Sequence, residues 1–473
     1  MRRIEMNHIL SIISLQVENF KNITNGKIEF PNVSNFERNN VLGIYGQNAS
    51  GKTAIIKAMS ILKDIISLSD LPKRNNDIIK IGTDTANLVL TYQINDMELK
   101  RVYEGSYEVT IKRSVEGPVI IREKVTVTRD LAVENQIDYN LENLKATRTL
   151  EITCDLEIEG NLFNYTNSKA RLSNLDFSDL KPEEQIRLQV RSEDSREKRR
   201  SLIFHKDMKS IVPEEIGKTI YKLQSKFINH TFIIEPLQMA MLYDNVFLPI
   251  NFYMSEENLR SGGTIGFSTG NVGLNHSEDF MLLDNKSYEI ADKLFAQINK
   301  ILPNLIPSLK VKLEKQGEKM MENGEKRIRT GLISIREGEE LPFSYESEGV
   351  KKLVSLISLF SAMYNERNML VIIDELDAGV HEYLLGQIMR VLSDDGKGQL
   401  LFTSHNIHLL EVLNKDNFVF STVDDTNRFI KFKNVKKSNN LREMYLRNII
   451  LQNGDTKIYE ETDAFDIRKS FER

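Results

Sequence analysis

Residues 41–53 of this 473-residue chain read Val-Leu-Gly-Ile-Tyr-Gly-Gln-Asn-Ala-Ser-Gly-Lys-Thr, and this stretch decides the fold. The first five residues form a short apolar run of the kind found in buried strands. The next eight match the pattern G-x-x-x-x-G-K-[ST], in which glycines allow backbone N–H groups to close around phosphate. The run from Ala54 to Leu62 then predicts a helix, whose N-terminus favours an anion. Strand, loop and helix in this order predict an α/β fold that binds a nucleotide.

The phosphate loop supplies most of the expected ligands for ATP and Mg²⁺. Lys52 is expected to reach the β- and γ-phosphates, and the Thr53 hydroxyl is expected to bind Mg²⁺. The expected ATP contacts in the loop are Gly46, Gln47, Asn48, Ala49, Ser50, Gly51, Lys52 and Thr53.

A second motif lies at residues 369–375, where the apolar run Met-Leu-Val-Ile-Ile ends in Asp374 and Glu375. At the end of a strand, Asp374 would hold Mg²⁺ or its water shell, and Glu375 would polarise an attacking water as general base. Taken alone, two acids after a strand favour a solvated turn. The phosphate loop in the same chain makes the nucleotide site the better interpretation.

Residues 399–405 repeat this form, with an apolar strand that ends at His405. The ends of parallel strands meet at one edge of a sheet, so His405 is expected beside Glu375 and the γ-phosphate. A lone histidine after a strand is more often structural, and only this placement favours a role in the site.

Upstream, Ser347 and Gly349 lie just before the helix predicted from Leu353 to Tyr364. A serine and a glycine at a helix N-terminus can form a second seat for an anion. The simpler alternative is an ordinary N-cap. Two half-complete phosphate seats in one chain suggest a nucleotide held between two copies.

The order of these motifs resembles the ABC-type ATPase heads. Within them it resembles the branch of chromosome and recombination ATPases and of the overcoming-lysogenization-defect proteins. The resemblance is closest to stand-alone ATPase subunits of bacterial anti-phage and abortive-infection systems. It rests on the segments GxYGxNxSGKT, ESEGxKxL, IIDExDxGxH and TSHNxxLL, within residues 10–60 and 340–450.

The resemblance implies a role for each matching residue. Lys52 and Thr53 would belong to Walker A, and Asp374 and Glu375 to Walker B. Ser347 and Gly349 would form a signature motif acting across a dimer, Asp377 would lie in the D-loop, and His405 would be the switch histidine. The signature reads Ser-Glu-Gly where transporters have Ser-Gly-Gly. Gln93 and Gln136 remain alternatives for the Q-loop glutamine.

We expect one ATPase head that is split by an insertion, because Lys52 and Asp374 lie far apart in the sequence yet should meet at one Mg²⁺. Four alternating segments between residues 87 and 128 predict an antiparallel meander beside a mixed central sheet. The sequence has no sustained heptad repeat, so we expect no long coiled coil. The expected divisions are a first part of the head at 1–145, a mostly helical insertion at 146–305, a second part of the head at 306–455 and a polar tail at 456–473.

Composition excludes several classes of protein. The chain has 63 Lys and Arg residues against 68 Asp and Glu, and its net charge of −5 argues against a protein that coats nucleic acid. The single cysteine, Cys154, excludes a disulfide framework and fits a reducing cytosol. It lies on the apolar face of an alternating segment and should be buried. The longest nearly apolar run is too short to span a bilayer, so we expect a cytoplasmic protein without a membrane partner.

The expected function is that of an ABC-type ATPase whose two copies close on ATP·Mg²⁺ and open after slow hydrolysis. The resemblance implies a homodimer or larger even oligomer that acts as sensor or scaffold in anti-phage defence. It would control a separate toxic effector, a nuclease being the leading candidate, and would respond to a phage-encoded trigger, with DNA as an optional partner. The alternatives are a DNA repair or recombination ATPase, which the missing heptads disfavour, and an ATP-dependent structural clamp with negligible hydrolysis, which Glu375 disfavours.

Overall fold

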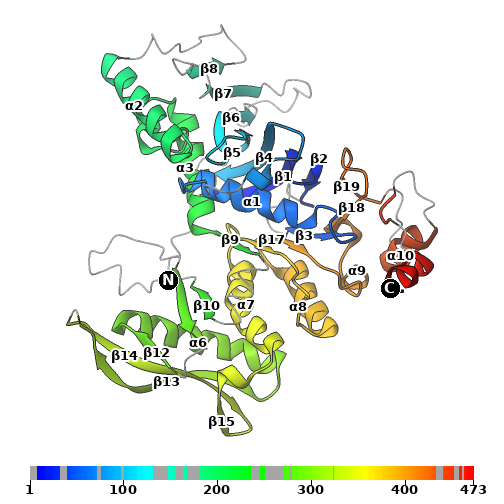
Figure 1. Cartoon of the computed structure of the whole chain (residues 1–473). Helices are drawn as coiled ribbons and strands as arrows, with labels where there is room; N and C mark the ends of the chain where they lie inside the picture. Colours follow the sequence, from blue (N-terminus) through cyan, green and yellow to red (C-terminus); the bar gives the residue numbers. More distant parts are fainter. Residues whose placement is uncertain are drawn as a thin grey trace, which may run out of the picture. The chain divides into compact units, whose positions relative to one another are not determined.

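The chain forms two compact units (Figure 1). The first comprises residues 1–36, 40–233 and 414–473, and the second comprises residues 37–39 and 234–413. This computed structural model describes residues 8–31, 40–71, 76–96, 101–130, 147–155, 163–167, 181–235, 245–250, 270–275, 280–322, 324–432, 440–451, 457–460 and 463–472.

A seven-stranded antiparallel sheet makes up much of the first unit (Figure 1). Alternate residues of β4 are buried, as the alternating pattern predicts, and Cys154 of β7 is buried as expected. In order across the sheet, the strands are β2 (Ile23–Glu29), β1 (His8–Phe20), β4 (Thr85–Asp96), β5 (Arg101–Lys112), β6 (Val119–Asp130), β7 (Thr147–Asp155) and β8 (Phe163–Asn167).

The predicted meander is confirmed, but with three strands instead of four. The second and third predicted segments are one strand, β5, which runs through Gly105 without a turn. A Cβ atom at Gly105 would lie 2.5 Å from the ring of Tyr92, the residue opposite it on β4. The glycine therefore makes room for a buried tyrosine instead of ending a strand.

The buried carboxylate of Glu123 links the sheet to the segment around residue 202 by hydrogen bonds. Glu123 of β6 accepts hydrogen bonds from the Tyr107 hydroxyl at 2.6 Å and from the Leu202 backbone N–H at 2.8 Å. The Ser201 hydroxyl donates a third at 2.5 Å. Burial raises the pKa of Glu123, and these donors oppose that rise.

A smaller mixed sheet in the first unit carries the phosphate loop. Strand β3 (Asn40–Tyr45) pairs in parallel with β18 (Phe418–Ser421), and β18 pairs antiparallel with β19 (Phe429–Ile430). Helix α1 (Lys52–Ile66) follows the loop and buries an apolar stripe with helical spacing that includes Ile55, Met59 and Leu62. The other named helices of this unit are α2 (Pro182–Lys198), α3 (Glu214–Asn229), α10 (Leu441–Leu451) and α11 (Ala464–Phe471).

The second unit contains a hydrophobic core between α6 (Asn285–Leu305), the β13–β14 hairpin and α7 (Glu348–Asn365). The hairpin consists of β13 (Leu309–Met320) and β14 (Lys326–Arg336), which pair antiparallel. At the turn, Gly324 has a φ of 80°. The remaining strands of this hairpin sheet are β12 (Met281–Leu283) and β15 (Glu339–Pro342), and β10 (Asn245–Ile250) pairs with β11 (Gly270–Asn275).

The predicted alternation of helices and buried strands follows α7. Strand β16 (Leu370–Ile373), helix α8 (Glu382–Asp395) and strand β17 (Gln399–Thr403) follow in order, with β16 and β17 parallel and wholly buried. Helix α9 (Leu409–Val412) ends this stretch, and β9 (Thr231–Ile234) lies at the sequence boundary between the units. Of the described helices the longest is α6, with 21 residues, and none is long and apolar enough to cross a bilayer.

Candidate nucleotide-binding site

The phosphate loop turns on residues with unusual backbone angles. Gly46 has a φ of 151° and Gly51 a φ of 95°, and α1 begins at the next residue. Ala49 has a φ of 62°, in the left-handed region that residues other than glycine rarely adopt. The loop therefore places the N-terminus of α1 directly after its second glycine, as phosphate binding requires.

Lys52 lies inside this loop. Its side chain is only 7% exposed, and its ammonium donates to the carbonyls of Gly46 and Gln47 at 2.8 Å each. Thr53, the next residue, is exposed. A lysine inside the loop and an exposed threonine hydroxyl beside it are the groups that bind phosphate and Mg²⁺ in such loops.

The base of the loop rests on the end of β18. The Ser421 hydroxyl donates to the Tyr45 carbonyl at 3.1 Å and is hydrogen-bonded to the Ser50 hydroxyl. A Cβ atom at Gly46 would lie 1.8 Å from the Ser421 hydroxyl oxygen. Gly46 is thus needed for this close approach as well as for its φ. Sequence reasoning missed Ser421.

In the second unit, Asp374 and Glu375 follow β16 and face different surroundings. Asp374 is 1% exposed, and one of its carboxylate oxygens, Oδ1, accepts a hydrogen bond from the Thr403 hydroxyl at the end of β17. The same hydroxyl accepts from the Glu375 backbone N–H at 2.8 Å. Thr403 therefore joins the ends of the two strands at the acidic pair.

The donor set at Asp374 fits a cation or its water shell. Its other oxygen, Oδ2, is buried and has no hydrogen-bond partner among the described residues. A buried carboxylate oxygen without a donor is costly unless a cation or an ordered water compensates it. A single carboxylate together with phosphate oxygens is the usual way in which proteins hold Mg²⁺.

Glu375, by contrast, is exposed and has a φ of 51°. One acid is thus placed to hold a cation and the next one to meet water.

Asp377 and His405 are brought together by hydrogen bonds. The backbone N–H of His405 donates to both carboxylate oxygens of Asp377, at 3.2 Å each. The imidazole of His405 is exposed. The turn after β16, residues 374–378, is called the acidic turn below. The predicted proximity of His405 to this turn is present within the second unit.

Ser347 and Gly349 open α7. The Ser347 hydroxyl accepts from the Val350 N–H at 3.4 Å, so the N-cap interpretation is confirmed, and the signature role stays a prediction. A Cβ atom at Gly349 would lie 1.9 Å from the carbonyl oxygen of Gly379. Only glycine allows α7 to approach the turn after Asp377 this closely.

Lys352 joins α7 to the acidic turn, and sequence reasoning missed it. The side chain is 1% exposed, and its ammonium donates to the carbonyls of Glu375 at 2.9 Å and Ala378 at 2.7 Å. Burial lowers the pKa of Lys352 to about 8, although the carboxylates of Asp377 and Glu375 raise it. A lysine next to the apolar face of a helix was the signal that could have found it.

The Q-loop glutamine stays unassigned. Gln93 lies within β4, opposite Ser11 of β1, and Gln136 falls outside the described residues. Among the described residues, no three His, Cys, Asp or Glu side chains form a group that could hold a metal.

A phosphate loop that opens α1, and a buried aspartate next to an exposed glutamate after β16, define the class of P-loop nucleotide-binding proteins. Within that class, the chain belongs to the AAA ATPase domain family, whose sequence profile matches residues 11–410.

Several solved structures are similar to the chain at low identity. The Smc head bound to the C-winged helix domain of ScpA has 12% identity and a TM-score of 0.42, over 89% of this chain and 98% of that one. The SMC head domain from Thermotoga maritima has 12% identity and a TM-score of 0.35, over 89% and 99%. The recombination mediator RecF with ATP has 12% identity and a TM-score of 0.29, over 84% and 94%. No curated protein matches the chain.

Proposed function

We propose that this protein binds and slowly hydrolyses ATP with Mg²⁺ as an ABC-type ATPase. Lys52 and the loop from Gly46 to Thr53 bind the phosphates. Thr53 and Asp374 hold Mg²⁺, and Glu375 acts as general base with His405 near the γ-phosphate. The order of the motifs and the membership in an ATPase family support this assignment.

The observation that carries the proposal is the divergence of the two acids after β16. Asp374 is buried with one oxygen held by Thr403, whereas Glu375 is exposed on a left-handed backbone. A protein that only clamps ATP needs the first acid and not the second. Bound Mg²⁺ would supply charge neutralisation at the phosphates, and the exposed Glu375 carboxylate would take the proton of a water molecule.

The first prediction concerns hydrolysis. The Glu375→Gln variant should bind ATP but hydrolyse it about 10²–10⁴-fold more slowly, because an amide cannot accept the proton of water. Phosphate release and equilibrium binding of a fluorescent ATP analogue measure the two properties separately.

Lys52→Ala is the matched control, and it should lose ATP binding as well. A Glu375→Gln variant that hydrolyses ATP at the parent rate would show that the base is misassigned. A parent protein that binds ATP but does not turn it over would favour the structural clamp.

We further propose that the ATPase works as a homodimer or larger even oligomer in the cytoplasm. Ser347, Gly349 and Asp377 would contribute to the ATP site of a second copy. In this arrangement the protein is the sensor or scaffold of an anti-phage system and controls a separate effector, with a nuclease as the leading candidate. The motif resemblance supports this biological role, and the effector is the part that most needs a direct test.

The second prediction is that the ATP-locked Glu375→Gln variant, captured from its native host, retains a partner with nuclease or other toxic activity. The association should depend on ATP, so Lys52→Ala captured in parallel should retain less of it. Mass spectrometry with a nuclease assay on the captured material measures both. Recovery of DNA ends with a repair nuclease would instead favour the DNA repair alternative.

A further inference from the structure

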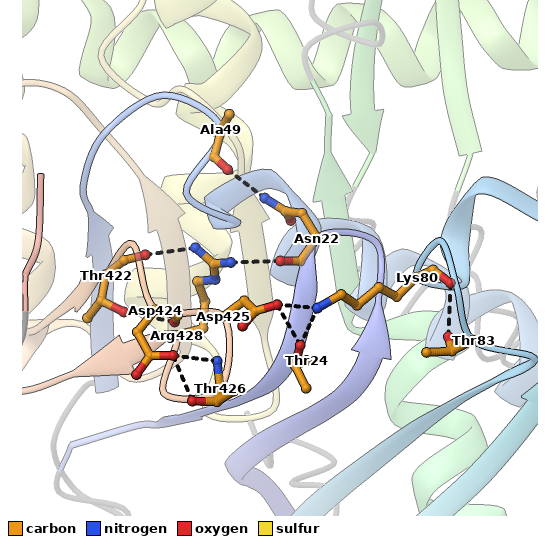
Figure 2. A network of polar contacts seen from close by, with 10 residues as sticks. All are labelled: Asn22, Thr24, Ala49, Lys80, Thr83, Thr422, Asp424, Asp425, Thr426 and Arg428. Atoms are coloured by element: carbon orange, nitrogen blue, oxygen red, sulfur yellow. Dashed lines mark hydrogen bonds and ion pairs between the residues drawn. The ribbon is translucent and has the colours of Figure 1, made fainter. Parts of the chain in front are cut away.

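A polar network in the first unit reaches the phosphate loop at Ala49 (Figure 2). The side-chain amide of Asn22, in the turn between β1 and β2, donates to the Ala49 carbonyl at 2.5 Å. The backbone carbonyl of Asn22 accepts a hydrogen bond from the Arg428 guanidinium at 2.8 Å. Two contacts thus connect Arg428, just before β19, with the middle of the loop.

Arg428 is held in place by a second carbonyl. Its other terminal nitrogen donates to the Thr422 carbonyl at 2.8 Å, and the side chain is only 7% exposed. A planar guanidinium can bind two carbonyls that lie in different directions, whereas an ammonium is a single point of charge on a flexible stem. The site therefore requires arginine in particular.

The stem of Arg428 also lies close to the second glycine of the loop. A Cβ atom built at Gly51 would lie 3.5 Å from the Arg428 Cδ and 3.2 Å from the Ile23 Cγ1. Gly51, at a φ of 95°, is the residue that leads into α1. The same arginine thus supports the loop at its second glycine and, through Asn22, at Ala49.

The conformation of Ala49 explains why such support is needed. A left-handed backbone at alanine is strained and persists only where neighbouring contacts hold it. Its carbonyl is held by Asn22, and the next residue, Ser50, is hydrogen-bonded to Ser421.

We propose that Arg428 and Asn22 are positioning residues for ATP: they fix the phosphate loop in the shape that receives the phosphates, without touching the nucleotide. This inference rests on the proposed binding of ATP by the loop. Their loss should weaken ATP binding while the rest of the first unit stays folded.

The same network offers a matched control. The Lys80 ammonium contacts the carboxylate of Asp425 and the hydroxyl of Thr24, and no contact of its side chain reaches the phosphate loop among the described residues (Figure 2). Asp425 lies in the turn between β18 and β19, which also carries Arg428. Lys80→Met therefore removes a charged contact from that turn.

The third prediction compares Arg428→Lys, Asn22→Ala, the double variant and Lys80→Met. Arg428→Lys and Asn22→Ala should each raise the dissociation constant for Mg·ATP about tenfold, as expected for a lost hydrogen bond at a positioned loop. The double variant should be weaker than either single variant but by less than the product of their effects, because the two residues act in series. The rate at saturating ATP should change by less than about twofold, since no catalytic group is removed.

Lys80→Met should bind ATP as the parent does, and all melting temperatures are measured alongside. Arg428→Lys that binds ATP like the parent overturns the inference, as does an equal loss in Lys80→Met. If Arg428→Lys fails to fold, the exposed Asn22 carries the test through Asn22→Ala. The Lys52→Ala variant distinguishes failure of this inference from failure of the proposed function. If the parent binds ATP no better than Lys52→Ala, the proposed ATP binding itself is wrong.

Discussion

Lys352 shows what a single buried charge does in this protein. Its ammonium donates to two carbonyls of the acidic turn, and burial lowers its pKa to about 8. A lysine in an unfolded chain has a pKa of about 10.4. Between these two values the unfolded chain keeps a proton that the folded chain has released. The free energy of unfolding should therefore rise with pH across this window.

The fourth prediction follows from this difference. Between pH 8 and 10.5 the free energy of unfolding of the parent should rise by about 2 kcal/mol relative to that of Lys352→Met, which lacks the titrating group. Below about pH 7 the difference between the two proteins should be constant, because the lysine is then protonated in both states. Urea unfolding at a series of pH values measures this.

Lys351→Met is the control, because its ammonium donates to the Ser344 carbonyl in an exposed contact. This variant should keep the pH dependence of the parent. Parallel curves for the parent and Lys352→Met across the whole range would show that the buried ammonium does not titrate there.

At the level of single residues, the sequence predicted the candidate site groups and missed the residues that hold them in place. The loop, Asp374, Glu375 and His405 were recognisable because each follows an apolar run in a known pattern. Lys352 and Arg428 were not, because their partners are backbone carbonyls of residues distant in the sequence. Every residue has a carbonyl, so no side-chain type marks the acceptor.

At the level of elements, local patterns predicted most strands and helices. Strand β3, helix α1 and the alternation from α7 to β17 follow the predicted order, because their apolar spacing is set by burial on one or both faces. The division of β5 was wrong because Gly105 looked like a turn. Its role depends on Tyr92 of the neighbouring strand, which only the pairing of the sheet brings opposite.

The elements of the second unit also explain the spacing of its motifs. The approach of Gly349 to Gly379 and the contacts of Lys352 fix the start of α7 against the turn after β16. Movement of α7 relative to this turn would therefore disturb Glu375 and Ala378 directly. The start of α7 and the acidic turn are thus held together by direct contacts, although more than twenty residues separate them in the sequence.

At the level of the whole molecule, the fifth prediction concerns association. Ser347→Arg should abolish association of two copies driven by Mg·ATP, because a long cation at this helix start would obstruct a partner's nucleotide. ATP binding by the single copy should persist. Light scattering with size exclusion, in the Glu375→Gln background, measures the association.

Ser347→Ala serves as the control, since it removes the cap of α7 without adding bulk and should cost about 1 kcal/mol of stability. It should still associate. A Ser347→Arg protein that no longer binds ATP as a monomer would mean that Ser347 acts only as a local cap.

The contact between Ser50 and Ser421 has a consequence for how the protein is made. The two hydroxyls meet across 371 positions of the chain. At roughly 5–20 residues per second, Ser421 is synthesised roughly 20–70 s after Ser50. The phosphate loop therefore leaves the ribosome long before its support does. The contact that supports the loop from β18 can therefore form only after the acidic turn has been translated.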